Sequence, residues 1–142
     1  MKDTNLKGTI TELKCQTHFL ELGYTVSVPI NPSRYDFVLD TGSKLLKVQV
    51  KTCNNNNPEF LVFSTCSSHY VQGQHVHTAY KNDDVDYFCT YFDNQCYLVP
   101  VSECGKREKR LRLVPTNNGQ TNNIAFAANY VAEDVLAKQI RD

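Results

Sequence analysis

Two apolar runs joined by a glycine turn place the strongest constraint on how this chain can fold. The runs are residues 35–39 and 45–50, and Gly42 lies in the short turn between them. Apolar runs on either side of such a turn are typical of a β-hairpin. Because side chains alternate between the two faces of a strand, Gln49 and Lys51 share one face of the second strand. The pattern therefore predicts a hairpin with a polar group on one face.

The polar face of this hairpin combines groups that suit a divalent cation. Asp36, at the start of the first apolar run, supplies an anionic oxygen, and Gln49 supplies a neutral one. The backbone carbonyl of Val50 offers a third oxygen, and hard oxygen ligands are those that Mg²⁺ prefers. Lys51 can orient an attacking water and offset charge on a phosphate. These residues predict metal-assisted hydrolysis of a phosphodiester, although each residue type is also common in ordinary strands.

Residues 8–22 are predicted to form a helix that brings another carboxylate to this site. Apolar residues recur there at helical spacing, and Gly23 is a typical stop just past the last of them. Glu12 lies beside the apolar stripe, so it can hold a metal-bound water if the helix packs across the edge of the sheet. The apolar face expected to pack on the sheet consists of Ile10, Leu13, Phe19 and Leu20.

The rest of the chain is predicted to contain further strands and one closing helix. Hydrogen-bonding and aromatic side chains dominate residues 66–81, which we expect to form a ribbon that contacts a polar partner, or else an ordinary surface loop. This order of elements predicts one α/β domain over residues 1–142, with a mixed central β-sheet flanked by helices. The predicted strands are residues 24–29, 60–63, 85–92, 95–101 and 111–115, and the predicted helix is residues 125–141.

Charge is balanced overall but clustered locally. The chain has 15 Lys and Arg residues and 15 Asp and Glu residues, so its formal net charge is zero. Five basic residues nevertheless fall within residues 106–112. Because phosphates respond to the local potential, a neutral protein can still present a basic face to them. The run equally suits a solvated strand or loop, and both interpretations stay open.

The cysteines and the N-terminus indicate a reducing compartment. The six cysteines include no CxxC pair, and residues 1–5 lack the apolar core of a signal peptide. No run approaches the ~20 apolar residues of a membrane span, so we expect a cytoplasmic protein without a membrane segment. Scattered free thiols are then favoured over disulfides. A zinc site made by some cysteines with His75 and His77 is the weaker alternative.

In combination, these segments resemble the PD-(D/E)xK nuclease superfamily, and more narrowly the small bacterial family of group I intron-encoded homing endonucleases. The resemblance rests on the opening helix with Glu12, on Arg34-Tyr35-Asp36, and on a strand with Gln49 in the slot that is usually acidic. Each motif alone is weak, whereas together they cover nearly the whole chain. The downstream blocks that resemble the family are residues 86–88, 97–101, 110–113 and 127–130.

The resemblance implies a restriction-endonuclease-like core and a Mg²⁺-dependent endonuclease that cuts double-stranded DNA at a specific site. It implies that Mn²⁺ can substitute and that Ca²⁺ supports binding without cleavage. Gln49 in place of the usual acid removes one negative charge and should weaken metal affinity. The active-site roles that it implies fall on Glu12, Asp36, Gln49 and Lys51, and the metal contacts on Asp36, Gln49, Glu12 and the Val50 carbonyl.

A double-strand break needs two nicks, and one active site per chain suggests a homodimer or homotetramer on a near-palindromic target. Side chains of the polar ribbon are expected to read base edges in the major groove, and basic side chains to hold phosphates. The candidates for base reading are Gln72, Gln74, His75 and His77. The basic candidates are Lys44 and Lys47 beside the site, together with Lys106, Arg107, Lys109 and Arg110.

Two other functions suit the same residues. One is a structure-specific or restriction-type nuclease of the same fold, such as a Holliday junction resolvase. The other is a DNA-binding module whose catalysis has decayed. A homing endonuclease is the leading hypothesis, which implies a protein of the bacterial cytoplasm that associates with the nucleoid when bound to DNA.

Overall fold

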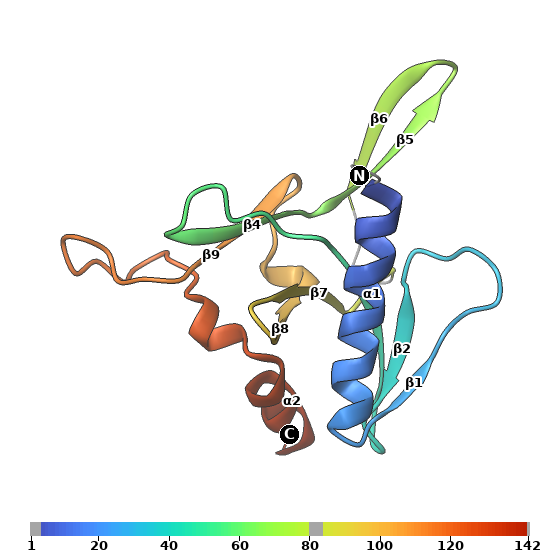
Figure 1. Cartoon of the computed structure of the whole chain (residues 1–142), viewed down its shortest axis with the longest axis horizontal. Coiled ribbons are helices and arrows are strands. Elements are labelled where there is room, and N and C mark those ends of the chain that lie inside the picture. Colours follow the sequence, from blue (N-terminus) through green and yellow to red (C-terminus); the bar gives the residue numbers. More distant parts are fainter. Residues whose placement is uncertain (1–3, 80–83, 142) are drawn as a thin grey trace.

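The computed structural model describes residues 4–79 and 84–141, and Figure 1 shows how they are arranged. At the centre lies a five-stranded mixed sheet in the order β1-β2-β3-β7-β8. Within this sheet β3 and β7 run parallel, and the other neighbours run antiparallel. Its strands are β1 (Thr25–Ser27), β2 (Phe37–Asp40), β3 (Leu45–Val50), β7 (Tyr87–Phe92) and β8 (Gln95–Pro100).

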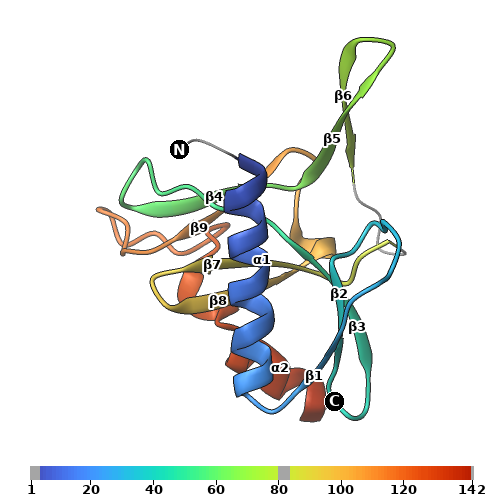
Figure 2. The same ribbon diagram turned by 45° about the vertical axis from the view of Figure 1, so that its right-hand side comes forward.

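Among the described residues, two smaller sheets and two helices complete the fold. One antiparallel pair is β4 (Phe60–Ser64) with β9 (Glu108–Arg112), and the other is β5 (Cys66–Val71) with β6 (Gln74–Ala79). The helices are α1 (Thr4–Glu21) and α2 (Ala132–Arg141), with 3₁₀ turns at η1 (Val101–Glu103) and η2 (Ala127–Tyr130). The β5–β6 ribbon projects away from the rest of the molecule in both views (Figure 1 and Figure 2). Neither helix, over its described length, is long and apolar enough to cross a lipid bilayer.

The predicted hairpin is present, with the expected strands and turn. β2 pairs antiparallel with β3 in the register Phe37↔Val48. Gly42 adopts a φ of 93° in the turn, a left-handed conformation that glycine reaches without steric cost. The Asp40 carboxylate accepts a hydrogen bond from the Gly42 N–H at 2.8 Å, which closes the turn. Asp36 therefore lies just before the first paired residue of β2, at the end of the hairpin away from the turn.

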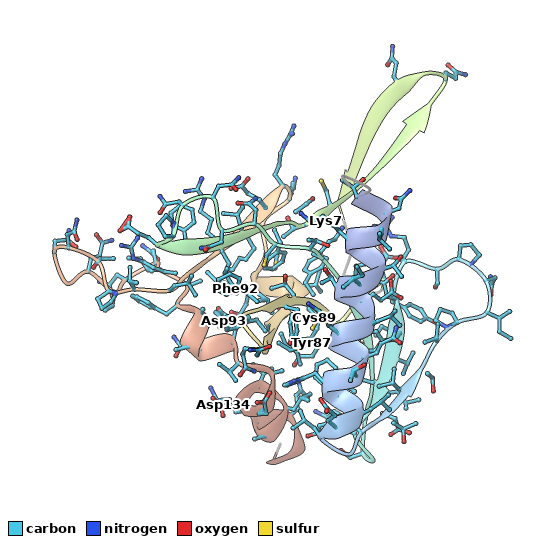
Figure 3. The ribbon with its side chains drawn as sticks, viewed as in Figure 1. Lys7, Tyr87, Cys89, Phe92, Asp93 and Asp134 are labelled. Carbon is cyan, nitrogen blue, oxygen red and sulfur yellow. The ribbon has the colours of Figure 1, made fainter. Side chains whose placement is uncertain are left out.

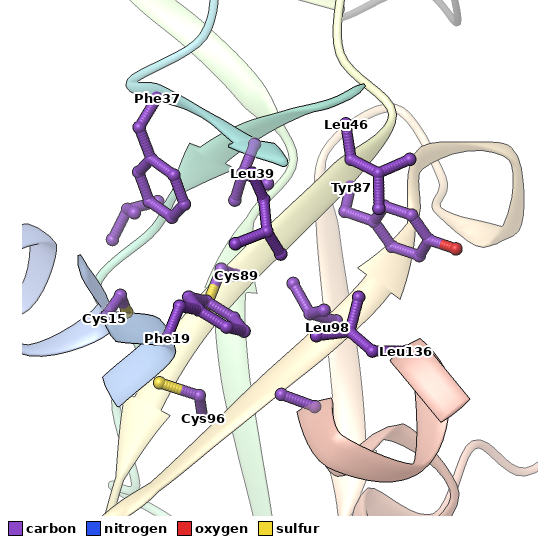
Figure 4. Packing of buried hydrophobic residues seen from close by; sticks show 13 residues of the cluster. Cys15, Phe19, Phe37, Leu39, Leu46, Tyr87, Cys89, Cys96, Leu98 and Leu136 are labelled. Carbon is purple, nitrogen blue, oxygen red and sulfur yellow. The ribbon is translucent and has the colours of Figure 1, made fainter. Parts of the chain in front are cut away.

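Both helices pack on one face of the central sheet. The buried cluster on this face joins Cys15 and Phe19 of α1 to Leu136 of α2 through strand residues such as Phe37 (Figure 4). The ring centroids of Phe19 and Phe37 lie 6.0 Å apart. The opposite face is covered by the β4–β9 pair, so the sheet lies between helices and a second sheet. The buried residues of that second interface are Leu61, Phe63, Phe88, Val99, Leu111 and Ala127.

The apolar face predicted for α1 is largely wrong. Phe19 is fully buried as expected, but its buried companion is Cys15. Ile10, Leu13 and Leu20 are 44%, 55% and 56% exposed. Helical spacing identifies a stripe of apolar residues but does not say whether that stripe meets the chain's own sheet. The sheet instead meets roughly the opposite face of the helix, where Cys15 and the Phe19 ring pack against the strands.

The β4–β9 pair differs from its prediction. The strand expected at residues 111–115 is β9, which begins at Glu108 and ends at Arg112. Its partner β4 sets this position, because Leu61 and Leu111 pair in the interior and Ser64 pairs with Glu108. Beyond β9 the chain meets Pro115, which has no N–H to contribute to a ladder.

The closing helix is shorter than predicted because residues 125–131 are drawn to the sheets. The Ala125 carbonyl accepts a hydrogen bond from the Arg112 N–H at 2.7 Å. Val131 has extended backbone, with ψ of 127°, and forms a bridge with Tyr97. A residue bridging to a strand cannot also continue a helix, so α2 begins at Ala132. At the other end of the chain, α1 begins at Thr4, earlier than the predicted residue 8.

Replacing Phe19 by Ala should lower the free energy of unfolding by about 3–5 kcal/mol, because it empties the contact between α1 and the sheet. Urea denaturation followed by circular dichroism measures this change. The control is Ile30→Ala in the loop after β1, where the side chain is fully exposed, and it should change stability by less than about 0.5 kcal/mol. Equal effects of the two changes would contradict the described packing of α1.

Candidate active site

Asp36 is anchored to the strand that carries the other predicted site residues. Its Oδ2 accepts a hydrogen bond from the Val50 N–H at 2.7 Å. Its own backbone N–H donates to the Val48 carbonyl at 2.8 Å. Burial raises the pKa of the Asp36 carboxyl, while the Val50 N–H and the charge of Lys51 act in the opposite direction. The side chain thus replaces a backbone partner at the end of the β2–β3 ladder.

Glu12 approaches the same place from the inner side of α1. It is half-buried, and its Oε1 accepts a hydrogen bond from Gln16 Nε2 at 3.4 Å. Burial raises the pKa of the Glu12 carboxyl, and the negative charge of Asp36 raises it further. The hydroxyls of Thr11 and Thr52 lie 3.4 Å apart and join α1 to the segment just after β3. Helix and hairpin therefore bring two carboxylates together, as the sequence predicts.

Lys51 follows β3 directly, and the backbone fixes it on two sides. Its N–H donates to the Cys89 carbonyl at 2.8 Å, and its Nζ donates to the Cys66 carbonyl at 3.0 Å. Burial lowers the pKa of the Lys51 ammonium, Cys66 and Asp36 raise it, and the nearby Arg34 lowers it. An ammonium among a carbonyl, a carboxylate and a guanidinium is an ionic centre rather than a solvated surface charge.

Gln49 and the Val50 carbonyl complete the predicted oxygen set. Gln49 is half-buried on β3, and its Nε2 lies 3.5 Å from the Val50 carbonyl oxygen, to which it donates. Continuing the β2–β3 register sets Gln49 opposite Asp36. Burial raises the pKa of both half-buried carboxyls, and Asp36 raises that of Glu12 further. Hard oxygen donors of this kind suit a divalent cation. The residues present therefore fit the metal that the sequence predicts.

Arg34 belongs to this group although the sequence reasoning gave it no role. Its Nη2 lies 3.8 Å from Asp84 Oδ2, and its charge acts on Lys51. The signal was available, since Arg34 stands two residues before Asp36. The Cys66 carbonyl, in contrast, has no side-chain signal. A backbone acceptor beside Lys51 becomes visible only once β4 and β5 are placed.

The polar ribbon predicted for residues 66–81 is the β5–β6 hairpin. Gln72 and Gly73 form its turn with φ of 52° and 80°, the type I′ geometry that matches the twist of paired strands. Gln72 and Gln74 are exposed at its tip. The backbone at His75 and His77 lies in β6, but their side chains fall outside the described part of the structure, as do residues 80–83.

The basic run joins the root of this ribbon. The Thr65 N–H donates to the Arg107 carbonyl at 2.9 Å. Thr65 directly precedes Cys66, whose carbonyl accepts the hydrogen bond from Lys51 Nζ. The Arg107 backbone is therefore bonded to the residue next to this contact. Arg107 and Lys106 are both exposed. This end of the run is therefore placed on the same side of the fold as the candidate active site.

The later basic residues take part in local contacts on β9. Lys109 Nζ donates to the Glu103 carbonyl at 2.8 Å and lies over the Tyr130 ring. Arg110 pairs with Glu108 at 3.2 Å and stacks on Phe60. Together with Arg112, these side chains line a groove of about 660 Å³. The run is thus partly a structural strand and partly an accessible basic surface.

Lys44 does not lie beside the site, contrary to its predicted position. It stands in the turn of the hairpin, where its Nζ donates to Gln139 Oε1 of α2 at 2.7 Å. The six-residue strand β3 separates it from Lys51, a distance of roughly 20 Å. Lys47 is half-buried on the strand face that also carries Gln49. Sequence proximity to the hairpin was misleading because the two ends of a hairpin lie far apart.

Three of the six free cysteines gather in the core, which no sequence spacing indicated. The sulfurs of Cys15, Cys89 and Cys96 lie within 4.8 Å of one another, and all three residues are buried. Burial raises the pKa of the Cys89 thiol. Zinc in proteins takes four ligands, or three and an open water position. Within the described residues no histidine or carboxylate joins this group, and it is closed to solvent, so it fits a packed thiol cluster better than a metal centre.

The fold and this site define an endonuclease family. The family model of PD-(D/E)XK endonucleases matches residues 2–133, so the chain belongs to that family. Nucleases of the family generally use divalent metal ions. Among solved structures the chain is similar to a bacterial homing endonuclease, I-Ssp6803I, with 26% identity over 98% of this chain and 95% of that one, and a TM-score of 0.76. A search of the curated proteins found no significant match.

Replacing Asp36 by Asn should raise the melting temperature at neutral pH by a few °C when metal is chelated, because it removes a half-buried negative charge that destabilises the fold by about 1 kcal/mol. A carboxyl whose folded pKa is raised binds protons more tightly in the folded state, so its charge costs stability above its unfolded pKa. The gain should disappear as the pH falls below the ordinary aspartate range. Differential scanning fluorimetry across that pH range measures it.

Asp134→Asn is the control for this comparison. Asp134 is exposed in the first turn of α2, where a negative charge favours the helix. Its replacement should leave stability unchanged or slightly lower at neutral pH. An equal gain from both changes would indicate a general charge effect rather than a cost specific to the site.

Proposed function

We propose that this protein is a Mg²⁺-dependent, site-specific endonuclease that hydrolyses phosphodiesters in double-stranded DNA and serves as an intron homing endonuclease. The observation that carries the proposal is the convergence of Glu12, Asp36 and Lys51, from a helix and a hairpin, at one end of the sheet. Membership of an endonuclease family supports the reaction class. Likeness to a bacterial homing endonuclease over nearly the whole chain supports the biological role.

The divalent ion would be held by Asp36 and Gln49, with the Val50 carbonyl and Glu12 as further oxygen donors. When bound there, it would supply charge stabilisation for the phosphate and its leaving oxygen. Gln49 in the acidic slot leaves the donor set with one charge fewer than two adjacent acids would give. The half-buried setting compensates in part, because charges interact more strongly where water is partly excluded.

Lys51 is suited to act on the attacking water and on the scissile phosphate. Its Nζ is held 3.0 Å from the Cys66 carbonyl, which fixes the direction of the remaining N–H donors. The lowered pKa of its ammonium makes proton exchange with a bound water easier than for a solvated lysine. Glu12, whose carboxyl has a raised pKa, can accept a hydrogen bond from the same water.

The projecting β5–β6 ribbon is the proposed reading element. A two-stranded ribbon fits the major groove, where glutamine can contact adenine with two hydrogen bonds. Gln72 and Gln74 are exposed at the tip, and His75 and His77 follow along β6. Lys106 and Arg107 at the root would hold phosphates, with Lys109, Arg110 and Lys47 as further candidates for backbone contact. Two or four copies would then share one target, with two of their active sites each nicking one strand.

Cleavage of duplex DNA that carries random insertions tests the proposal. With Mg²⁺, the wild-type chain should cut a small set of related sequences, and Lys51→Ala should lower the rate by about 10²–10⁴-fold, the usual worth of a positioned proton-transfer group. Ca²⁺-dependent binding of Lys51→Ala should stay close to that of wild type. Lys138→Ala on the exposed part of α2 is the matched control and should cut normally.

The same assay includes synthetic four-way junctions. Cutting of junctions regardless of sequence would replace the homing role with a structure-specific nuclease. Binding of duplex without Mg²⁺-dependent cutting, at any sequence in the library, would instead favour a binding module without catalysis.

Gln74→Ala should relax the sequence preference of cleavage at particular base pairs, at a cost of about 1–3 kcal/mol of discrimination for each lost bidentate contact. Arg107→Ala should instead weaken binding to all sequences alike and reduce the salt slope by about one, since it removes a phosphate contact. Sequencing of cleaved library members and binding titrations at several salt concentrations separate the two effects. A change of preference with Arg107→Ala, and none with Gln74→Ala, would place base reading outside the ribbon.

A further inference from the structure

The outer face of α1 carries an apolar stripe that its own fold leaves uncovered. Ile10, Leu13 and Leu20 are 44%, 55% and 56% exposed, and Leu6 at the start of the helix is 48% exposed. With Thr17, these residues recur at alternating spacings of four and three positions. This is the spacing of the a and d positions through which helices pack against each other. Hereafter, the outer stripe means these five residues.

The outer stripe is accessible to a second molecule. With 3.6 residues per turn, it falls on roughly the opposite side of α1 from Cys15 and Phe19, which meet the sheet. Both ribbon views show α1 at the surface, with no described element in front of it (Figure 1 and Figure 2). A hollow of about 270 Å³ lies beside the stripe, between α1 and Tyr91. Side chains from a facing helix can therefore enter beside the stripe.

The charges beside the stripe lie at the wrong ends of their own helix. Lys7 belongs to the first turns of α1 and Glu21 to its last, and both residues are exposed. The helix dipole favours the reverse order, with acid at the N-terminus and base at the C-terminus. Lys14 between them lies over the Tyr91 ring, 5.3 Å from its centroid. Figure 3 shows Lys7 near the N-terminal end of α1.

We propose that the outer stripe binds the same stripe of a second copy of this chain, with the two α1 helices antiparallel. The apolar layers then pair Ile10 with Leu20, and Leu13 with Thr17, of the other copy. Two-fold symmetry repeats both layers. The same register sets Lys7 opposite Glu21 at each end, so these two charges meet both an opposite charge and the favourable end of the facing dipole. At the two-fold axis it sets Lys14 against Lys14 of the other copy, and each of these ammonium groups lies over the Tyr91 ring of its own chain.

A parallel arrangement lacks this complementarity. It would set Lys14 against Thr9 and Glu21 against Gln16, with no ion pair between copies. It would also align the two dipoles in the same direction. The antiparallel pair gains two Lys7–Glu21 contacts against one Lys14–Lys14 contact, so the charge pattern favours it, and the self-complementary stripe selects a second copy over an unrelated partner.

The proposed function calls for an assembly of two or more copies, and this contact names the surface that would form it. Only this link rests on the proposed function. The stripe and the candidate active site use different sides of α1, since Glu12 is half-buried and close enough to Asp36 for that charge to raise its pKa, whereas the stripe is exposed. Association is measured as mass rather than as cleavage. A failure of the contact and a failure of the nuclease reaction are therefore separate results.

Sedimentation equilibrium of the full chain tests the contact. The wild-type chain should associate at micromolar concentration, and Ile10→Glu should raise the dissociation constant of that contact by about 100-fold or more, because two carboxylates would enter apolar layers. The matched control is Ile30→Glu, which makes the same change at a fully exposed isoleucine away from α1 and should leave the mass unchanged. Circular dichroism melting checks that both variants stay folded.

Charge reversal tests the direction of the helices. Lys7→Glu or Glu21→Lys alone should weaken association, and the two changes together should restore it to within a few-fold of wild type. A wild-type chain that stays monomeric at every concentration overturns the proposal. So does an Ile10→Glu chain that associates as wild type does, or a double reversal that remains as weak as the single ones.

Discussion

The hydrogen bond from the Val50 N–H to Asp36 Oδ2 holds the candidate site together. It closes the end of the β2–β3 ladder with a side chain where a backbone carbonyl would otherwise accept. Val50 is itself part of the buried cluster, so the carboxylate is tied to the core rather than to a mobile loop. Gln49 and Lys51 flank Val50 along the chain, and their positions follow from the same bond.

The site is kept at a cost in stability. Burial raises the pKa of the Asp36 and Glu12 carboxyls and lowers that of the Lys51 ammonium. Each shift favours the neutral form of the group, so the fold opposes the charges that it brings together. Parallel pairing of β3 with β7 places the Cys89 carbonyl against the Lys51 N–H and keeps the strand end rigid.

The candidate active site and the uncovered apolar stripe lie on different surfaces of the molecule. One end of the sheet carries the carboxylates, the lysine and the projecting ribbon, with the start of the basic run at the ribbon's root. The outer side of α1 carries an uncovered apolar stripe. A single helix thus contributes Glu12 to one surface and Ile10 to another, because residues two apart on a helix face different directions.

Local pattern alone determined the hairpin, the spacing of Asp36, Gln49 and Lys51, and the α1 helix. These depend on short-range alternation and turn chemistry, which are readable residue by residue. Tertiary structure alone decided which face of α1 is buried, where β9 begins, that Val131 interrupts the closing helix, and that Lys44 lies far from the site. Each of these depends on a partner distant in the chain, such as β4 for β9 and Tyr97 for Val131. Apolar periodicity identifies an apolar helix face, but only tertiary packing decides whether that face meets the chain's own sheet or remains at the surface.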